Sequence, residues 1–345
     1  MMRLILPFQK TLQRLRALRS TLRRLMLLPD RFRALAQRVD DVEFAFAIHQ
    51  RETRMIHVAT NKPHVIPRAS ESGLAPAEPA IEAVTHSTLC RQQDFLQPWF
   101  AYWTRRIVSG PRFHRKLWEF IFICQGLWER GVLVPGARGL GFGVGGEPLP
   151  ALFAAHGCEI MGTDLGAEGA LALGWVETAQ HAHEKESLRR PEICPNDQFD
   201  RLVSFQACDM NQISPHLTGF DFCWSSCAFE HLGSIEKGLR FVENSVECLK
   251  PGGWAIHTTE YNLYSNEDTL DNAGTVLFRR RDFEALAARL TAKGHRVAPL
   301  SFESGDGLMD NWIDVAPYLE EPSLKLALAG YGTTSFGIIV QRGTS

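Results

Sequence analysis

The stretch Ala137-Arg138-Gly139-Leu140-Gly141-Phe142-Gly143-Val144-Gly145-Gly146 decides the fold of this chain. An apolar segment over 131–134 precedes it, and a helix-like segment over 149–157 follows it. This order predicts a β-strand, a tight glycine-rich turn and an α-helix. Glycine lets the main chain adopt positive φ and lets a ligand approach closely, and a helix N-terminus offers unpaired N–H groups. The stretch therefore predicts a site for a cofactor that carries a nucleoside.

Beyond residue 131, apolar strand-like runs alternate with helical segments. We expect strands over 137–141, 158–163, 202–207, 220–225, 253–259, 295–302 and 334–341. Such alternation is typical of a doubly wound α/β fold, in which helices cover both faces of a mostly parallel sheet. These sheets bind ligands beyond the C-terminal ends of the strands, where the strand order reverses.

Polar residues stand at several of these strand ends. Asp164 ends the second strand, where a carboxylate can accept hydrogen bonds from both hydroxyls of a ribose. Asp209 follows the third strand, where its carboxylate could accept a hydrogen bond from the exocyclic amine of an adenine while Met210 packs against the ring. The alternative for Asp209 is an Asx-type turn. Glu230 and His231 follow the fourth strand, and His231 is the best candidate for a general base, with a structural histidine as the alternative.

Taken in order, these signals resemble the class I S-adenosylmethionine-dependent methyltransferases over roughly residues 131–341. Phe220-Asp221, Glu230-His231-Leu232 and Leu249-Lys250-Pro251-Gly252-Gly253 also match that pattern. The resemblance implies a seven-stranded, Rossmann-like sheet whose last strand is antiparallel, with 295–302 and 334–341 as the closing hairpin. It also implies that S-adenosylmethionine lies across the ends of the first three strands.

The resemblance implies specific site residues. The expected catalytic residues are His231 and Glu230, and no metal is expected. The expected cofactor contacts are Gly141, Phe142, Gly143, Gly145, Glu147, Asp164, Leu165, Asp209, Met210 and Ser225. The glycine run, with Gly174-Trp175 and Gln180-His181, resembles a bacterial subgroup placed near glycan or cell-surface biosynthesis. We therefore expect O-methylation of a small-molecule or glycan-type acceptor, over which the inserts 186–200 and 261–278 would lie.

One position departs from the family pattern. The family usually carries an acid two residues before the first glycine, where it holds the ammonium end of the cofactor, but this chain has Gly139. Glu147 is the candidate replacement. Without it, a non-catalytic methyltransferase-like scaffold stays an alternative. A NAD(P)-dependent oxidoreductase is the other rival, because Gly141, Gly143 and Gly146 also satisfy G-x-G-x-x-G; the Asp-Met pair and the Pro-Gly-Gly turn favour the methyltransferase.

Three regions precede or form the predicted domain. Residues 1–58 read as a basic amphipathic helical or coiled-coil extension, suited to docking, to a second copy of the chain or to a peripheral membrane contact. Residues 59–90 read as a proline-rich linker. Residues 91–345 are the methyltransferase domain, and its helical lead-in over 91–130 carries core aromatics. In that lead-in we expect Trp118 in the core and Glu119 on the surface.

Composition limits the remaining classes. The net charge of −2 over 345 residues argues against a nucleic-acid partner. Eight cysteines without a C-x-x-C pair argue against structural zinc and favour a reducing cytoplasm. No apolar run approaches the ~20 residues that a membrane-spanning helix needs.

Overall fold

The computed structural model describes residues 39, 42, 78–166, 182–319 and 321–344. Its contacts divide the chain into two units, Met1–Ile66 and Pro67–Ser345, and the fold below is that of the second unit. Apart from residues 39 and 42, the predicted extension over 1–58 lies outside the described residues, as does most of the predicted linker. Within the described part, no helix is long and apolar enough to cross a membrane.

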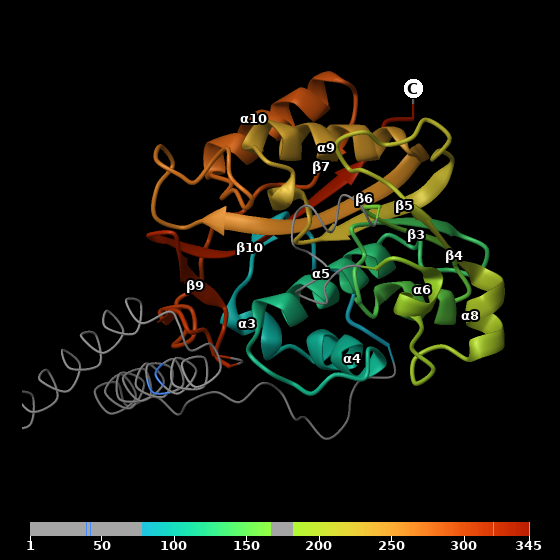
Figure 1. The fold of residues 1–345 in the computed structure, drawn as a ribbon, viewed down its shortest axis with the longest axis horizontal. Helices are drawn as coiled ribbons and strands as arrows, with labels where there is room; N and C mark the ends of the chain where they lie inside the picture. The colour runs from blue at the N-terminus through green and yellow to red at the C-terminus, as the bar shows by residue number, and fades with distance from the viewer. Residues whose placement is uncertain (1–38, 40–41, 43–77, 167–181, 320, 345) are drawn as a thin grey trace, which may run out of the picture. The chain divides into compact units, whose positions relative to one another are not determined.

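A twisted sheet forms the centre of this unit (Figure 1). Its first five strands in spatial order are parallel, and β10 is antiparallel to β6. The predicted mostly parallel sheet with an antiparallel last strand is thereby confirmed. The spatial order is β4 (Val203–Ala207), β3 (Glu159–Asp164), β2 (Arg138–Phe142), β5 (Phe220–Ser226), β6 (Leu249–Asn262), β10 (Tyr331–Gln341), β9 (Lys325–Leu328) and β8 (Ile313–Asp314).

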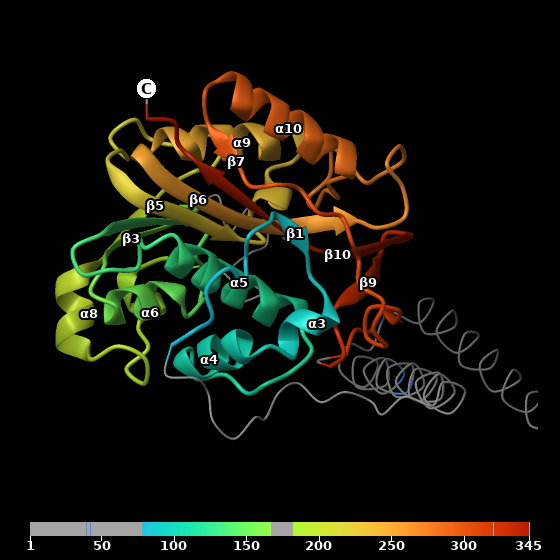
Figure 2. The ribbon, with the colours of Figure 1, turned by 180° about the vertical axis from the view of Figure 1, so that it is seen from behind.

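The sheet has ten strands in the described part of the chain, not the predicted seven, and the difference lies at its edge. Both β1 (Thr88–Leu89) and β7 (Arg296–Val297) pair with β10, and β1 lies beside it in Figure 2. The C-terminal end of the expected linker over 59–90 therefore forms a strand of the sheet, β1. The expected strand over 295–302 shortens to β7, because Pro299 lacks an N–H for the ladder and its carbonyl accepts from Ser87 N–H at 2.9 Å instead.

Helices cover both faces of the sheet, α9 and α10 on one and the remaining helices on the other (Figure 1). Ser234 caps α9 by accepting from Lys237 N–H at 3.2 Å, and the apolar side of α9 packs on the sheet through Leu239 and Val242. The helices are α3 (Gln92–Phe95), α4 (Pro98–Arg106), α5 (Arg115–Glu129), α6 (Leu149–Ala155), α8 (Asn196–Leu202), α9 (Ile235–Glu247) and α10 (Arg280–Ala292), with 3-10 turns η1 (Lys185–Leu188) and η2 (Phe229–His231).

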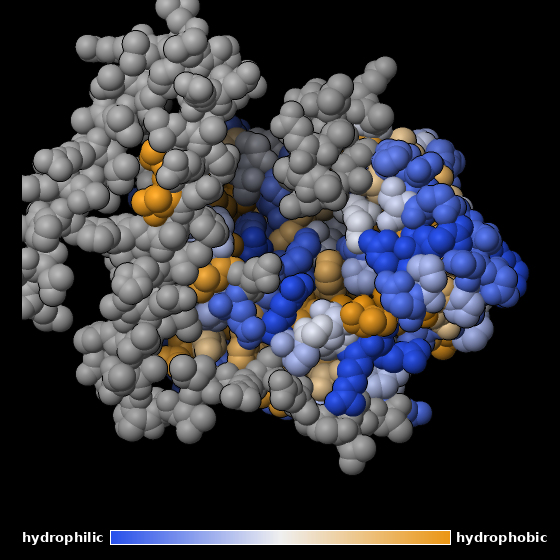
Figure 3. Space-filling view, turned by 60° about the horizontal axis from the view of Figure 1, so that its bottom comes forward, coloured by the Kyte–Doolittle hydropathy of each residue, from blue (hydrophilic) through white to orange (hydrophobic). Residues whose placement is uncertain are grey.

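The predicted helical lead-in supplies much of the core. Trp103, Trp118 and Phe122 are almost completely buried, as the aromatic pattern predicts. The Phe122 ring lies so close to β10 that a Cβ on Gly337 would meet it at 2.2 Å, so glycine is required there. On the face shown in Figure 3, hydrophilic side chains dominate the described surface and apolar ones lie in small groups.

Candidate functional site

The glycine turn joins β2 to α6 in a form that only glycine permits. Gly143 and Gly145 have φ of +59° and +47°, values that side chains disfavour. A Cβ on Gly143 would also meet the Ala228 Cβ at 2.8 Å. The N–H of Val144 donates to the Thr163 carbonyl at 3.1 Å. The turn is thus closed onto the end of β3.

Asp164, at the end of β3, binds this turn directly. Its Oδ2 accepts from the N–H groups of Gly145 and Ala182, each at 3.0 Å, and its Oδ1 accepts from Leu165 N–H at 2.7 Å. An ionised carboxylate offers about four acceptor positions, so Asp164 keeps capacity for a further donor. The two strongest sequence signals therefore meet at one place, the adjacent ends of β2 and β3.

Asp209 and Met210 lie beyond the end of β4. Oδ1 of Asp209 accepts from Asn211 N–H at 2.8 Å, which is the Asx-type turn held as the alternative. Met210 is 7% exposed, and its Sδ would lie 3.4 Å from a Cβ on Gly143. Met210 therefore packs beside the glycine turn, and the adenine contact of Asp209 stays a prediction.

Two expected contacts have their side chains turned into the core. The Phe142 ring is fully buried and stands edge-on to Phe241, with ring centroids 5.1 Å apart. The Ser225 hydroxyl is also fully buried and bonds to Nδ1 of His257 at 2.9 Å. Burial lowers the pKa of His257 to about 3, so this histidine is neutral. Side chains alternate between the two faces of a sheet, and those of Phe142 and Ser225 point to the face opposite Glu147. Only the main chain of these two residues can therefore border the cofactor site.

At Gly139, where the family pattern has an acidic residue, the packing leaves no room for a side chain. A Cβ on Gly139 would meet the Phe222 ring at 2.4 Å and the Ile160 Cδ1 at 2.9 Å. Glu147 lies on the same face of the sheet, where its Oε1 accepts from Trp224 Nε1 at 2.6 Å. Burial raises the pKa of Glu147 to about 8 although the hydrogen bond from Trp224 lowers it. Glu147 is thus a buried carboxyl group that is mostly protonated at neutral pH, and a positive charge placed near it would favour its ionised form.

The two expected catalytic residues differ in exposure. Nδ1 of His231 lies 2.9 Å from the Gly274 carbonyl and 3.1 Å from the Thr275 hydroxyl. Nε2 of the same ring lies 3.8 Å from Glu230 Oε1. Glu230 is 1% exposed, and its Oε2 accepts from the Thr259 hydroxyl at 2.8 Å. Gly274 belongs to 261–278, so this predicted insert contacts His231; its role over the acceptor stays a prediction.

Sequence reasoning missed a buried charged network over the ends of β5 and β6. Glu119, expected on the surface, is 0% exposed and lies 3.2 Å from Lys116 Nζ and 3.3 Å from Arg115 Nη1. It also accepts from Cys227 Sγ at 2.8 Å and from the Ser335 hydroxyl. Burial raises the pKa of Glu119, but Lys116 and Arg115 outweigh it and hold the pKa at about 2. The available signal was a charged i, i+4 pair on a helix that is otherwise apolar.

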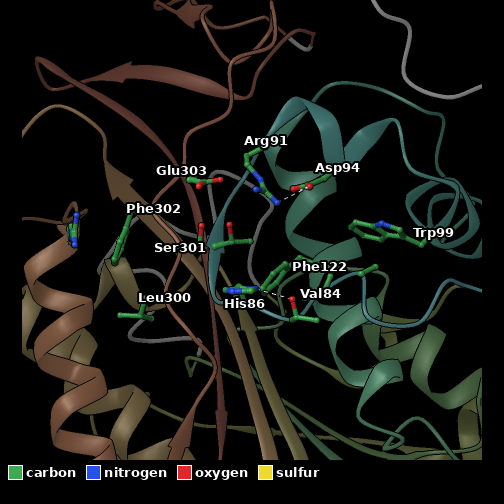
Figure 4. A pocket seen from close by; sticks show the side chains of 14 residues that line it. Val84, His86, Arg91, Asp94, Trp99, Phe122, Leu300, Ser301, Phe302 and Glu303 are labelled. Atoms are coloured by element: carbon green, nitrogen blue, oxygen red, sulfur yellow. Dashed lines mark hydrogen bonds and ion pairs between the residues drawn. The ribbon is translucent and has the colours of Figure 1, made fainter.

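A separate cavity of about 650 Å³ lies beside β1 (Figure 4). β10 separates β1 from β6, so this cavity is away from the glycine turn. Its cations have acidic partners, Arg91 with Asp94 and Arg280 with Glu284. We assign no catalytic role to it.

Comparison with known proteins adds to this geometry. Residues 140–257, about a third of the chain, match the model of a family described as a methyltransferase domain. A comparison with curated protein sequences found no match.

Several solved structures are similar to the chain. One is an S-adenosylmethionine-dependent methyltransferase from Mesorhizobium loti, with 14% identity over 63% of this chain and 96% of that chain, and a TM-score of 0.39. Another is the magnesium protoporphyrin IX methyltransferase from Synechocystis with bound S-adenosylhomocysteine, with 12% identity, 71% and 94% coverage and a TM-score of 0.39. A third is phosphoethanolamine N-methyltransferase 2 from Haemonchus contortus, with 20% identity, 60% and 44% coverage and a TM-score of 0.34.

The matched segment runs from β2 into β6, and it contains the glycine turn, Asp164, Asp209 and Glu230. Residues 140–257 are thus similar to a methyltransferase domain, and they lie in a mixed α/β unit with a mostly parallel central sheet.

The residues present fit S-adenosylmethionine. Gly143 is half-buried and Gly146 is exposed, so part of the main chain of the turn is accessible, and Asp164 keeps acceptor capacity for hydroxyl groups. Glu147 is a buried carboxyl group close to that turn, suited to an ammonium group. When bound, S-adenosylmethionine supplies a methyl group on a sulfonium, which is already electrophilic, so the protein's contribution is alignment and exclusion of water.

Proposed function

We propose that this chain transfers a methyl group from S-adenosylmethionine to a hydroxyl group of a small-molecule or glycan-type acceptor. The observation that carries the proposal is the junction of the glycine turn with Asp164, inside the segment that matches a methyltransferase domain. Asp164 would hold the ribose, Asp209 and Met210 the adenine, and Glu147 the ammonium group of the cofactor.

The proposal gives His231 the role of general base. A hydroxyl group is weakly acidic and needs a proton acceptor as it attacks. A proton on Nδ1, donated to the Gly274 carbonyl, would leave Nε2 as the basic nitrogen, and Glu230 lies beside it to stabilise the imidazolium. Residues 1–58 would serve as a contact for an anionic membrane surface or a second copy of the chain.

Calorimetry with S-adenosylmethionine, S-adenosylhomocysteine and NAD tests the proposal. We expect the first two to bind and NAD not to bind. Asp164→Ala should weaken binding roughly 10- to 100-fold, because it removes hydrogen bonds to a charged acceptor, whereas Asp197→Ala removes an exposed carboxylate and should leave affinity unchanged. Binding of NAD alone would indicate an oxidoreductase, and no binding at all would indicate a scaffold. An unchanged affinity in Asp164→Ala would refute the ribose assignment.

A further inference from the structure

A second group of polar side chains lies at the same edge of the sheet as the glycine turn. Cys227 follows β5 directly, Glu230 lies in η2 and Glu260 is near the end of β6, and one ligand atom of each lies within 4.8 Å of the others. β5 pairs with β2, with Ser225 opposite Phe142. The group is therefore next to the proposed cofactor site.

The hydrogen bonds of this group are incomplete. Glu260 is 4% exposed, and its Oε1 pairs with Arg115 Nη2 at 2.5 Å. Its Oε2 is buried and makes no hydrogen bond of standard geometry among the described residues, although the Thr333 hydroxyl is close enough to lower the pKa of Glu260. The hydroxyl of Thr258 is likewise buried without a partner there. Thr258 is two residues earlier on β6, so both side chains face the same side of the sheet. A buried carboxylate oxygen that lacks a partner is costly, which points to a ligand that supplies the donor.

The charges of this group are also unbalanced. When all three are ionised, Glu119, Glu230 and Glu260 carry three negative charges, against the two positive charges of Arg115 and Lys116. Glu119 already pairs with both cations, so the uncompensated negative charge lies on Glu230 and Glu260. Burial, and then the neighbouring carboxylates, raise the pKa of Glu260 to about 7 against the lowering effect of Arg115. One further positive charge would complete the group.

The thiol decides which cation fits. A zinc-type site built from this group would need the Cys227 thiolate as its third ligand, but the Cys227 thiol donates a hydrogen bond to Glu119 Oε1 at 2.8 Å. Burial and the adjacent carboxylates raise the pKa of this thiol well above its ordinary value, so it stays protonated. An organic ammonium group needs only acceptor oxygens, and its three N–H donors match the oxygens of two carboxylates.

We propose that Glu230 and Glu260 form an acceptor subsite that binds a positively charged amino group, so that the substrate class is an amine-bearing small molecule. The inference rests on the proposed function, since it takes the acceptor to lie beside the cofactor. The subsite anchors the acceptor through its amino group and leaves a neighbouring hydroxyl to approach the methyl donor.

Ligand-observed saturation-transfer NMR on the full chain tests this subsite with three probes of one shape: butylammonium, butan-1-ol and butyrate. We expect butylammonium to bind about tenfold more tightly than butan-1-ol at neutral pH, and butyrate not to bind. Glu260→Gln and Glu230→Gln should each remove most of this preference. Glu284→Gln, a change at an exposed carboxylate, should retain it.

Affinity for S-adenosylhomocysteine, measured in each variant, shows that the domain is folded and keeps the two proposals separate. Equal binding of the three probes, or an unchanged preference in both Glu→Gln variants, would overturn the subsite. A micromolar affinity for Zn²⁺ that disappears in Cys227→Ser would overturn it in favour of a metal site. Failure of the wild-type protein to bind S-adenosylhomocysteine would instead overturn the proposed function.

Discussion

Replacing Glu119 by glutamine should destabilise the protein strongly, although the two side chains have nearly the same shape. The carboxylate compensates Arg115 and Lys116 and accepts from Cys227 and two serine hydroxyls. Removing one partner of a buried ion pair costs about 3–5 kcal/mol. Because the Lys116 side chain is 40% exposed and solvent screens it, we expect the lower end, about 3 kcal/mol.

Urea and thermal unfolding, followed by circular dichroism, measure this loss. At about 2–4 °C per kcal/mol for a domain of this size, the midpoint should fall by roughly 10 °C. Glu284→Gln is the matched control, because it breaks an exposed pair with Arg280 and should change stability by under about 1 kcal/mol. A loss in Glu119→Gln no larger than in this control would refute the reasoning that the carboxylate holds two cations in place.

Three further outcomes follow from other sites. Gly143→Ala should cost about 1–2 kcal/mol in unfolding experiments and weaken S-adenosylhomocysteine binding in calorimetry, because of its positive φ; Gly110→Ala, where a Cβ meets nothing within 4 Å, is the control and should bind normally. The folded protein keeps a proton on Glu147 that the unfolded chain releases, so this group's contribution to stability is lost as pH rises from about 4.5 to about 8. Glu147→Gln should remove that fall, on the order of a few kcal/mol, from urea titrations across this pH range; identical pH profiles would contradict the assignment. Seven of the eight cysteines are buried, so a thiol reagent should modify at most Cys227 in the native protein and all eight in denaturant, and rapid labelling of several thiols would contradict the packing.

The parts of the fold set by neighbouring residues could be predicted from the sequence. The glycine turn and Asp164 belong to one strand-turn-helix-strand unit, in which backbone conformation and strand ends follow from local residue types. By contrast, the burial of Glu119 depends on Ser335, which is 216 residues away in the chain. A helix pattern alone cannot show that such partners will surround a carboxylate.

The same distinction explains the site. Asp209 and Ser225 stand at strand ends as expected, but the turn at Asn211 and the buried His257 decide where their side chains point. The loss of the usual acid at Gly139 is explained by the ring of Phe222, a residue on the adjacent strand. Such contacts form only after the strands have paired, so a one-dimensional pattern cannot reveal them.

The pairing of β1 with β10 has a consequence for biosynthesis. Thr88 lies opposite Gly337, so β1 stays without this neighbour until the ribosome has synthesised β10. Until then the edge of β6 has no partner and offers unsatisfied backbone groups to other nascent chains. We therefore expect truncation before β10 to yield insoluble aggregates rather than a smaller folded domain, and chaperones to assist its maturation in the cell.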